Sequence, residues 1–156
     1  MGSERPTPVP DDAARTLAIA SRVLERSLPD MTLPQLRVLS LVVRAPARAS
    51  QLASESAISR PSLTGVLDGL VDRGWVERTE VAGDRRGTAL EATAAGRRAL
   101  QEARAAVVAT LEDILAPVAP AQREAVIAGL VALGDALDAH LRRRAGRVGA
   151  GTEPRR

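Results

Sequence analysis

Residues 50–91 decide the fold, and they read SQLASESAISRPSLTGVLDGLVDRGWVERTEVAGDRRGTALE. In the middle of this stretch, apolar residues recur at helical spacing, which predicts one apolar stripe along a helix. The stripe comprises Leu63, Val66, Leu67, Leu70 and Val71. Ser59 is a suitable N-cap, Pro61 suits the first turn, and Gly74 suits the end. These signals predict a helix that begins after Ser59 and ends before Gly74.

The flanks of this helix carry signals for a second helix and for a hairpin. On the N-terminal side, Ser50 is predicted to cap a short helix, and a turn at residues 56–58 follows it. On the C-terminal side, two strand-like runs are separated by a turn with a charged tip. The runs hold Trp75, Val76 and Val81, then Thr88, Ala89 and Leu90, and the tip holds Asp84, Arg85 and Arg86. The stretch therefore predicts helix, turn, helix and hairpin.

The rest of the chain is predicted to be helical after an N-terminal arm. Residues 1–10 hold three prolines and are expected to be disordered. Apolar periodicity and proline breaks predict helices over residues 11–28, 32–45, 93–116 and 120–145. Thr32 and Gln35 are spaced as a capping box, and Thr93 is placed to cap the helix after the hairpin. The narrow apolar seams of the last two helices favour a partner helix, although both could pack on their own chain.

The composition excludes several classes of site. The chain of 156 residues has no Cys, which excludes disulfides, zinc–thiolate sites and thiol redox sensing. His140 is the one histidine, so we expect no metal site and no Ser-His-Asp constellation. No glycine-rich phosphate loop or paired carboxylate motif stands out, so we expect neither an enzyme nor a bound cofactor. Without a long apolar run or the apolar core of a signal peptide, the chain is expected to be cytoplasmic, with no membrane partner.

The distribution of charge is uneven along the chain. The formal net charge is +3, but the residues from Arg142 onward hold six Arg against one Glu. The remainder of the chain is therefore slightly acidic, and the stretch that decides the fold is not basic in bulk. If this stretch binds nucleic acid, its affinity must come from individually placed arginines and from helix N-termini.

The helix, turn, helix and hairpin resemble a winged helix-turn-helix, and an ordered set of motifs extends the resemblance to the MarR family of bacterial transcription regulators. The motifs are residues 33–36 (LPQL), 59–64 (SRPSLT), 66–68 (VLD), 74–78 (GWVER), 84–86 (DRR) and 93–97 (TAAGR). Each is weak alone, but they follow one another at the family's spacing. Ser56 and Ala57 stand where a large apolar residue and a glycine are usual, and Ser56 is expected to weaken the local packing. Gly65 and Gly69 stand where basic residues are frequent.

The resemblance implies a mainly α fold with a small antiparallel β-wing, organised as a single MarR-like domain over residues 11–145. Residues 32–92 would form the lobe that binds double-stranded DNA, and residues 11–31 and 93–145 would form the homodimer. Residues 146–156 are predicted to be a basic flexible tail. The implied function is that of a homodimeric repressor on a pseudo-palindromic operator. A winged-helix module that is architectural or binds protein is the rival interpretation, which the glycines at positions 65 and 69 favour.

The DNA contacts are predicted at the start of the second helix and at the hairpin tip. The helix residues are Ser59, Arg60, Pro61, Ser62, Thr64 and Gly65. Arg60 has the reach for a phosphate or for the O6/N7 edge of guanine. At the tip, the family's wing motif implies that Asp84 holds one guanidinium while the other, from Arg85 or Arg86, enters a minor groove. Ordinary solvated surface charges are the alternative at both places.

The resemblance also allows an effector pocket. Many relatives release DNA when a small lipophilic or phenolic anion binds between the dimerisation helices and the DNA-binding lobe. The candidate wall residues are Ile19, Arg22, Val23, Arg26, Leu36 and Arg37. An equally acceptable interpretation is that these residues are plain core and surface.

Overall fold

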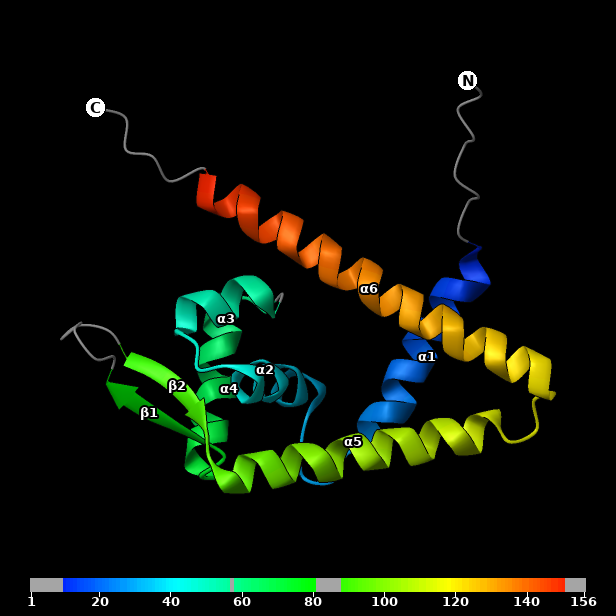
Figure 1. The fold of residues 1–156 in the computed structure, drawn as a ribbon, viewed down its shortest axis with the longest axis horizontal. Helices are drawn as coiled ribbons and strands as arrows, with labels where there is room; N and C mark the ends of the chain where they lie inside the picture. Colours follow the sequence, from blue (N-terminus) through cyan, green and yellow to red (C-terminus); the bar gives the residue numbers. More distant parts are fainter. Residues whose placement is uncertain (1–9, 57, 81–87, 151–156) are drawn as a thin grey trace.

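The structure is a computed structural model that describes residues 10–56, 58–80 and 88–150. The helices and strands are α1 (Asp11–Ser27), α2 (Leu33–Arg44), α3 (Ala49–Glu55), α4 (Arg60–Asp72), β1 (Val76–Glu80), β2 (Thr88–Ala92), α5 (Ala94–Leu115) and α6 (Pro120–Ala150). Helices α2 to α4 and the two strands form a lobe at one end, from which α1, α5 and α6 extend (Figure 1). The predicted fold class, mainly α with a small antiparallel wing, is confirmed.

The lobe is built around leucine side chains from several elements. The most buried of them are Leu39, Leu52, Leu70 and Leu100, each with an exposed fraction of at most 1%. Helix α2 packs against α4, α5 and β2, so it lies at the centre of the lobe. On α4, the predicted stripe points inward, with Leu63 and Leu67 buried. Because this stripe faces the core, the opposite face of α4 is left to solvent.

Polar caps fix where α2, α4 and α5 begin. The Thr32 amide donates to Gln35 Oε1 at 3.0 Å, and the Gln35 amide donates to Thr32 Oγ1 at 3.3 Å. Ser59 Oγ accepts from the Ser62 amide at 3.4 Å, and Thr93 Oγ1 accepts from the Gly96 amide at 3.0 Å. The predicted capping box and the caps of α4 and α5 are therefore confirmed.

The cap predicted at Ser50 is wrong. Helix α3 begins one residue earlier, at Ala49, and its N-cap Arg48 makes no side-chain cap hydrogen bond. The reason is a long-range backbone pairing, in which the Ala47 amide donates to the Leu90 carbonyl at 3.1 Å and the Ala47 carbonyl accepts from the Leu90 amide at 2.9 Å. Because this bridge to β2 fixes Ala47, the next residue, Arg48, becomes the N-cap. The helix therefore begins at Ala49, ahead of Ser50.

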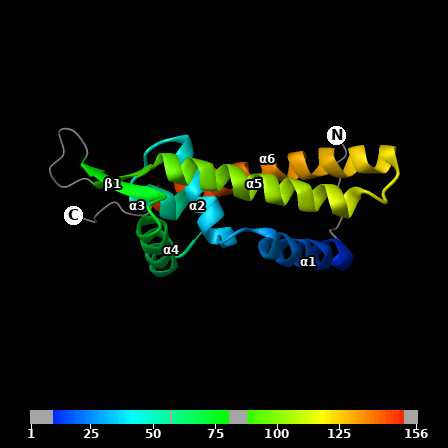
Figure 2. The same ribbon diagram turned by 90° about the horizontal axis from the view of Figure 1, so that it is seen from below.

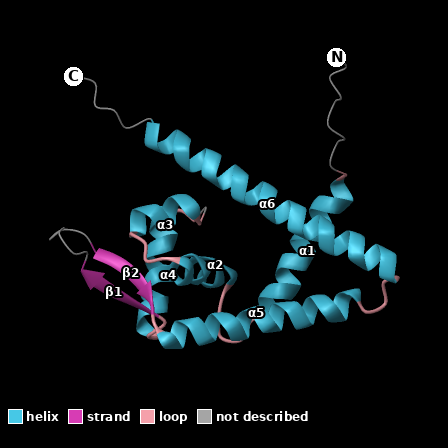
Figure 3. Cartoon of the chain, in the orientation of Figure 1, coloured by secondary structure: helices cyan, strands magenta, loops and turns pink. Residues whose placement is uncertain are grey.

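The wing is a two-stranded antiparallel ladder, drawn as arrows in Figure 3. Its register pairs Val76 with Ala92 and Glu80 with Thr88. Trp75, predicted to pack at the base of the wing, is half-buried beside the core just before β1. The Arg73 guanidinium lies over its ring, 4.8 Å from the centroid. Val81 lies outside the described residues.

The long helices leave many apolar side chains uncovered. Helix α1 buries no residue, and Leu17 and Ile19 on it are 56% and 53% exposed. On α6, Leu130 is 42% and Leu137 is 52% exposed. In Figure 2, α1 lies away from the lobe, whereas α6 runs back from the far end of α5 and contacts α3. The first half of α5 is different, because Leu100 and Ala103 are buried in the core of the lobe.

The predicted tail starts too early. Residues 146–150 continue α6 as helix to Ala150 instead of forming a flexible segment. The run Arg142–Arg144 and the neighbouring alanines favour helix, and the next proline is Pro154, so no strong breaker ends the helix at residue 146. The arm at residues 1–9 and residues 151–156 lie outside the described residues. In the described ranges, no helix has the length and apolar character needed to cross a membrane.

Candidate nucleic-acid interface

The N-terminal turns of α4 present the predicted contact residues together on one surface. Ser59, Arg60, Pro61, Ser62, Thr64 and Gly65 are all exposed. Leu63, in the middle of this set, is 3% exposed and anchors the turn to the core. The apolar anchor fixes the rotation of the helix about its axis, so these exposed residues face outward as a group.

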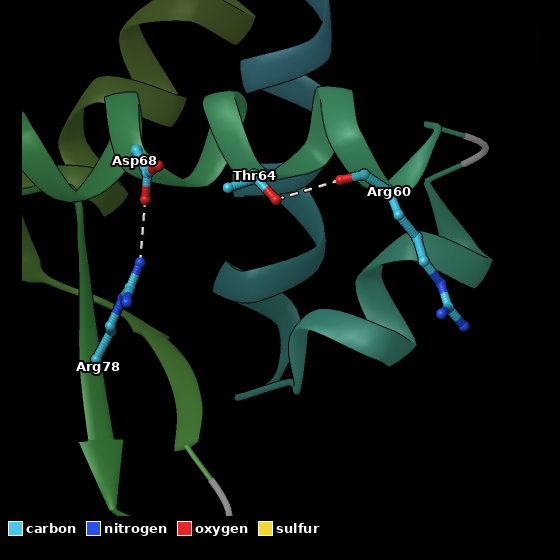
Figure 4. Close-up of polar contacts among 4 residues, drawn as sticks. All are labelled: Arg60, Thr64, Asp68 and Arg78. Atoms are coloured by element: carbon cyan, nitrogen blue, oxygen red, sulfur yellow. Dashed lines mark hydrogen bonds and ion pairs between the residues drawn. The ribbon is translucent and has the colours of Figure 1, made fainter.

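Hydrogen bonds within the helix distinguish Arg60 from its neighbours. Ser62 Oγ lies 2.8 Å from Ser59 Oγ, and Thr64 Oγ1 donates to the Arg60 carbonyl at 3.3 Å. The Arg60 guanidinium extends away from α4 (Figure 4) and has no hydrogen-bond or ion-pair partner in the described part of the chain. All of its donors are therefore available to an external acceptor.

A concave surface runs from α3 past this turn to the wing. One hollow of about 300 Å³ is lined by Ala49 and Ser50 of α3 and by Arg60 and Thr64 of α4. A second hollow of about 220 Å³ shares Ala49 and Thr64 and continues to Arg78 and Thr88 on the strands. The residues around Arg60 are small, so the surface can accept a convex partner without a large side chain in the way.

Asp68 and Arg78, for which the sequence predicted no site role, border this concave surface. Arg78 Nη2 donates to Asp68 Oδ1 at 3.0 Å and joins α4 to β1 (Figure 4). The two side chains are 57% and 53% exposed, so this ion pair contributes little to stability, about 0–1 kcal/mol. It is a direct side-chain link between the wing and α4. The motifs at residues 66–68 and 74–78 contained both residues, but their sequence spacing did not show that they meet.

The two glycines of α4 lie in different surroundings. A Cβ atom on Gly65 would meet nothing within 4 Å, so this exposed position has no packing reason to be glycine. A Cβ atom on Gly69 would lie 3.0 Å from Nε2 of Gln35, in the capping box of α2. Gly69 is half-buried against α2, and its side of α4 therefore has little room for a long basic side chain.

The hairpin tip lies outside the described residues, and this covers Asp84, Arg85 and Arg86. Strand β1 ends at Glu80 and strand β2 begins at Thr88, so the tip is connected to the end of the ladder that lies away from α5. The roles assigned to these three residues stay predictions.

Among the described residues, neither of the two hollows beside α4 is lined by a candidate effector residue. Ile19, Arg22, Val23 and Arg26 are exposed on α1. On α2, Leu36 packs half-buried against the core, and the Arg37 guanidinium donates to the Ser56 carbonyl at 3.0 Å. A hollow of about 310 Å³ lies elsewhere, where Leu41 and Arg44 of α2 and Glu55 of α3 face Asp138 and Arg142 of α6. The effector pocket stays a prediction. No cluster of metal-binding side chains occurs within the ranges that the structure covers.

Comparison with known proteins confirms the resemblance to the MarR family. A model of the MarR family matches residues 30–87, which include α2 to α4 and β1. The MarR family protein Rv2887 of Mycobacterium tuberculosis, solved with salicylic acid, is 25% identical with a TM-score of 0.67, over 81% of this chain and 96% of that chain. MarR of E. coli in its apo form is 22% identical with a TM-score of 0.68, over 81% and 98%. CouR of Rhodococcus jostii RHA1, bound to p-coumaroyl-CoA, is 20% identical with a TM-score of 0.60, over 78% and 87%.

Proposed function

Because residues 30–87 carry a MarR-family winged helix-turn-helix, we propose that the chain is a homodimeric transcription repressor that binds a pseudo-palindromic operator. The observation that supports this function most directly is the partner-free guanidinium of Arg60 on the exposed first turn of α4. A regulator of this type needs such a donor set at the start of its recognition helix.

The geometry of α4 suggests how the operator is read. Since the leucine stripe faces the core, the helix enters the major groove with its N-terminus leading. Arg60 then donates to O6 and N7 of a guanine, a pairing that discriminates by about 1–3 kcal/mol. The Thr64 hydroxyl is occupied by the Arg60 carbonyl, so Thr64 contributes its methyl group, for example to a thymine methyl. Ser62 contributes through a phosphate or a water molecule.

In this proposal, the symmetry of the operator follows from the symmetry of the protein dimer. The uncovered apolar side chains of α1, α5 and α6 pack on a second copy of the chain, which presents two α4 helices. A two-fold dimer requires half-sites centred about 10 bp apart, one helical turn of DNA.

A small lipophilic or phenolic anion is the effector class that we propose. Two relatives support it, since one was solved with salicylic acid and another with p-coumaroyl-CoA. The ligand would bind near α1 and α2 and must prefer the conformation that does not fit DNA. Salicylate is the first probe to add to an operator-binding assay.

A second candidate function is an architectural or protein-binding winged helix without an effector. Its support is the outer face of α4, where Asp68 and Asp72 are exposed and Gly65 carries no basic side chain. A gel-shift assay on the protein's own upstream region, at several salt concentrations, separates the candidates. A repressor retains a preferred site at elevated salt, an architectural protein binds all sequences alike, and a protein-binding module binds none.

The decisive experiment is a binding-site selection on the wild type and on Arg60→Ala. We expect the variant to lose its preference at one symmetric pair of positions, because the bidentate guanine contact is gone. A variant that binds more weakly but keeps every preference would show that Arg60 touches only phosphate, and the reading of guanine by Arg60 would then be wrong.

A further inference from the structure

Arg37 makes a contact that neither the core nor the predicted effector pocket requires. Its side chain leaves α2, and Nη1 donates to the backbone carbonyl of Ser56 at 3.0 Å. The two residues are 19 positions apart in sequence, so this is a tertiary contact and not a local one. Ser56 is the C-cap of α3, where the last carbonyls of a helix lack intrahelical partners.

Ser56 is held firmly at this position. Its exposed fraction is 0%, and its amide donates to the Leu52 carbonyl at 2.9 Å. Its Oγ accepts from the Ile58 amide at 3.4 Å. From sequence alone, this serine is expected to weaken local packing, because the resemblance to the family implies a large apolar residue there. In this structure, two hydrogen bonds hold the turn instead of an apolar side chain. One is to the Ser56 side chain and the other is to the Ser56 carbonyl.

The clamped carbonyl lies close in sequence to the DNA-reading residue. Ile58, which Ser56 binds, packs half-buried against the core, and Ser59 then caps α4. Arg60 is the first residue of α4, four positions after Ser56. Because the Ile58 amide donates to Ser56 Oγ and Ile58 directly precedes the N-cap of α4, we expect a displacement of Ser56 to reach the start of that helix.

The contact also joins two elements that pack mainly on other partners. Helix α2 packs on α4, α5 and β2, whereas α3 packs on α4 and α6. A hydrogen bond from a charged group is stronger than one between neutral groups, and this one links the central helix of the lobe to the end of α3. It is suited to fix the angle between α3 and α4.

We propose that Arg37 is a positioning residue for operator recognition, which acts on DNA through the turn between α3 and α4 without touching DNA itself. This inference rests on the proposed function. It differs from two other roles for the same side chain, a phosphate contact and a wall of the effector pocket, and each of these makes a different prediction.

The test compares three variants of the full-length protein. Arg37→Met keeps the length of the side chain and removes its donors, and Arg37→Lys restores one donor. Arg44→Met is the matched control, because Arg44 is exposed on the same helix, and its guanidinium has no hydrogen-bond partner among the residues described. For each protein, operator affinity, affinity for a scrambled duplex and the salt dependence of both are measured.

We expect Arg37→Met to bind the operator about tenfold more weakly, the effect of losing a hydrogen bond from a charged group. Its affinity for the scrambled duplex and its salt slope should match those of Arg44→Met. Arg37→Lys should recover most of the operator affinity. Rescue by lysine, together with an unchanged salt slope, identifies positioning as the cause.

Three results would overturn the proposal. A salt slope reduced by about 0.9 for Arg37→Met alone would indicate a lost phosphate contact. If Arg37→Met binds the operator as tightly as the wild type, Arg37 is not a positioning residue. A wall of the effector pocket would then be its remaining role. An equal loss on operator and scrambled duplex would indicate general damage to the fold. If Arg37→Met does not fold, the operator affinity of Arg37→Lys tests the proposal instead. A folded lysine variant that binds the operator about tenfold more weakly than the wild type, the loss expected without any donor, would contradict a positioning role for the hydrogen bond to Ser56. If the wild type itself prefers no site, the proposed function fails instead.

Discussion

At the scale of single residues, Gly96 is the glycine of the described chain at which a Cβ atom would meet the most severe obstacle, the Trp75 carbonyl. Gly96 is buried in the first turn of α5, and a Cβ atom there would overlap this carbonyl. Gly65, on the exposed side of α4, would place a Cβ atom in open space. The same substitution is therefore expected to have opposite effects at the two positions.

Gly96→Ala should lower the free energy of unfolding by at least about 1–3 kcal/mol, because either α5 or the start of β1 must move. Gly65→Ala should raise it by up to about 1 kcal/mol, since alanine favours the helix and meets no obstacle. Urea unfolding followed by the fluorescence of Trp75, the one tryptophan of the chain, measures both. Equal stabilities for the two variants would contradict the packing described at Gly96.

The sequence predicted which residues of α4 are exposed better than it predicted their hydrogen bonds. The exposed face of α4 follows from the leucine stripe, which local periodicity reveals. The pairing of Arg37 with Ser56 and that of Arg78 with Asp68 bring together residues that are 19 and 10 positions apart. Such contacts depend on how helices and strands pack, and a single sequence carries no direct signal for them.

At the scale of helices and strands, local capping signals predicted where a helix begins wherever no tertiary contact overrides them. Thr32, Ser59 and Thr93 each cap a helix as predicted. Ser50 does not, because the bridge between Ala47 and Leu90 sets the start of α3 from outside the segment. The start of a helix is predictable from sequence when a local cap alone determines it. It is displaced when a tertiary contact fixes the residues that precede the helix.

Thr93 joins the wing to α5 and offers a test of this joint. Its Oγ1 donates to the Gly74 carbonyl at 2.6 Å and accepts from the Gly96 amide at 3.0 Å. Thr93→Ala should lower the free energy of unfolding by about 0.5–2 kcal/mol, as expected for loss of an N-cap. Thr93→Ser keeps both hydrogen bonds and should remain close to the wild type. Urea titration of the three proteins measures the difference, and an alanine variant as stable as the serine variant would exclude a capping role.

At the scale of the whole molecule, the lobe is a packed body and the long helices are not. The core of the lobe is closed by α2, α4, the wing and the first half of α5. Beyond it, Val108 and Ile114 on α5 are 54% and 45% exposed, and α6 continues this uncovered apolar surface. The sequence predicted apolar seams on these helices, but it did not predict that α6 turns back to contact α3. Uncovered apolar side chains in this number are typical of a protein interface, which supports the proposed homodimer.

The proposed homodimer is tested on α6, which carries several of the exposed large apolar side chains. Leu130→Glu and Leu137→Glu place a charge on side chains that are 42% and 52% exposed in the single chain, so the lobe should fold normally. Each charge would be buried at the interface without a partner, which opposes association. We expect monomers by light scattering and an operator affinity lower by at least about 10²-fold, because the two half-sites are no longer bound together.

The control for this experiment is Gln122→Glu, which adds the same charge to an exposed polar position on α6. It should remain dimeric and bind the operator like the wild type. The fluorescence of Trp75 in the lobe reports whether the monomeric variants keep their fold. If Leu137→Glu stays dimeric, the seam on α6 is not the interface, and the partner surface must then be sought on α1 and α5. If it becomes monomeric but binds the operator undiminished, the two half-sites are recognised independently, and the pseudo-palindrome is not required for affinity.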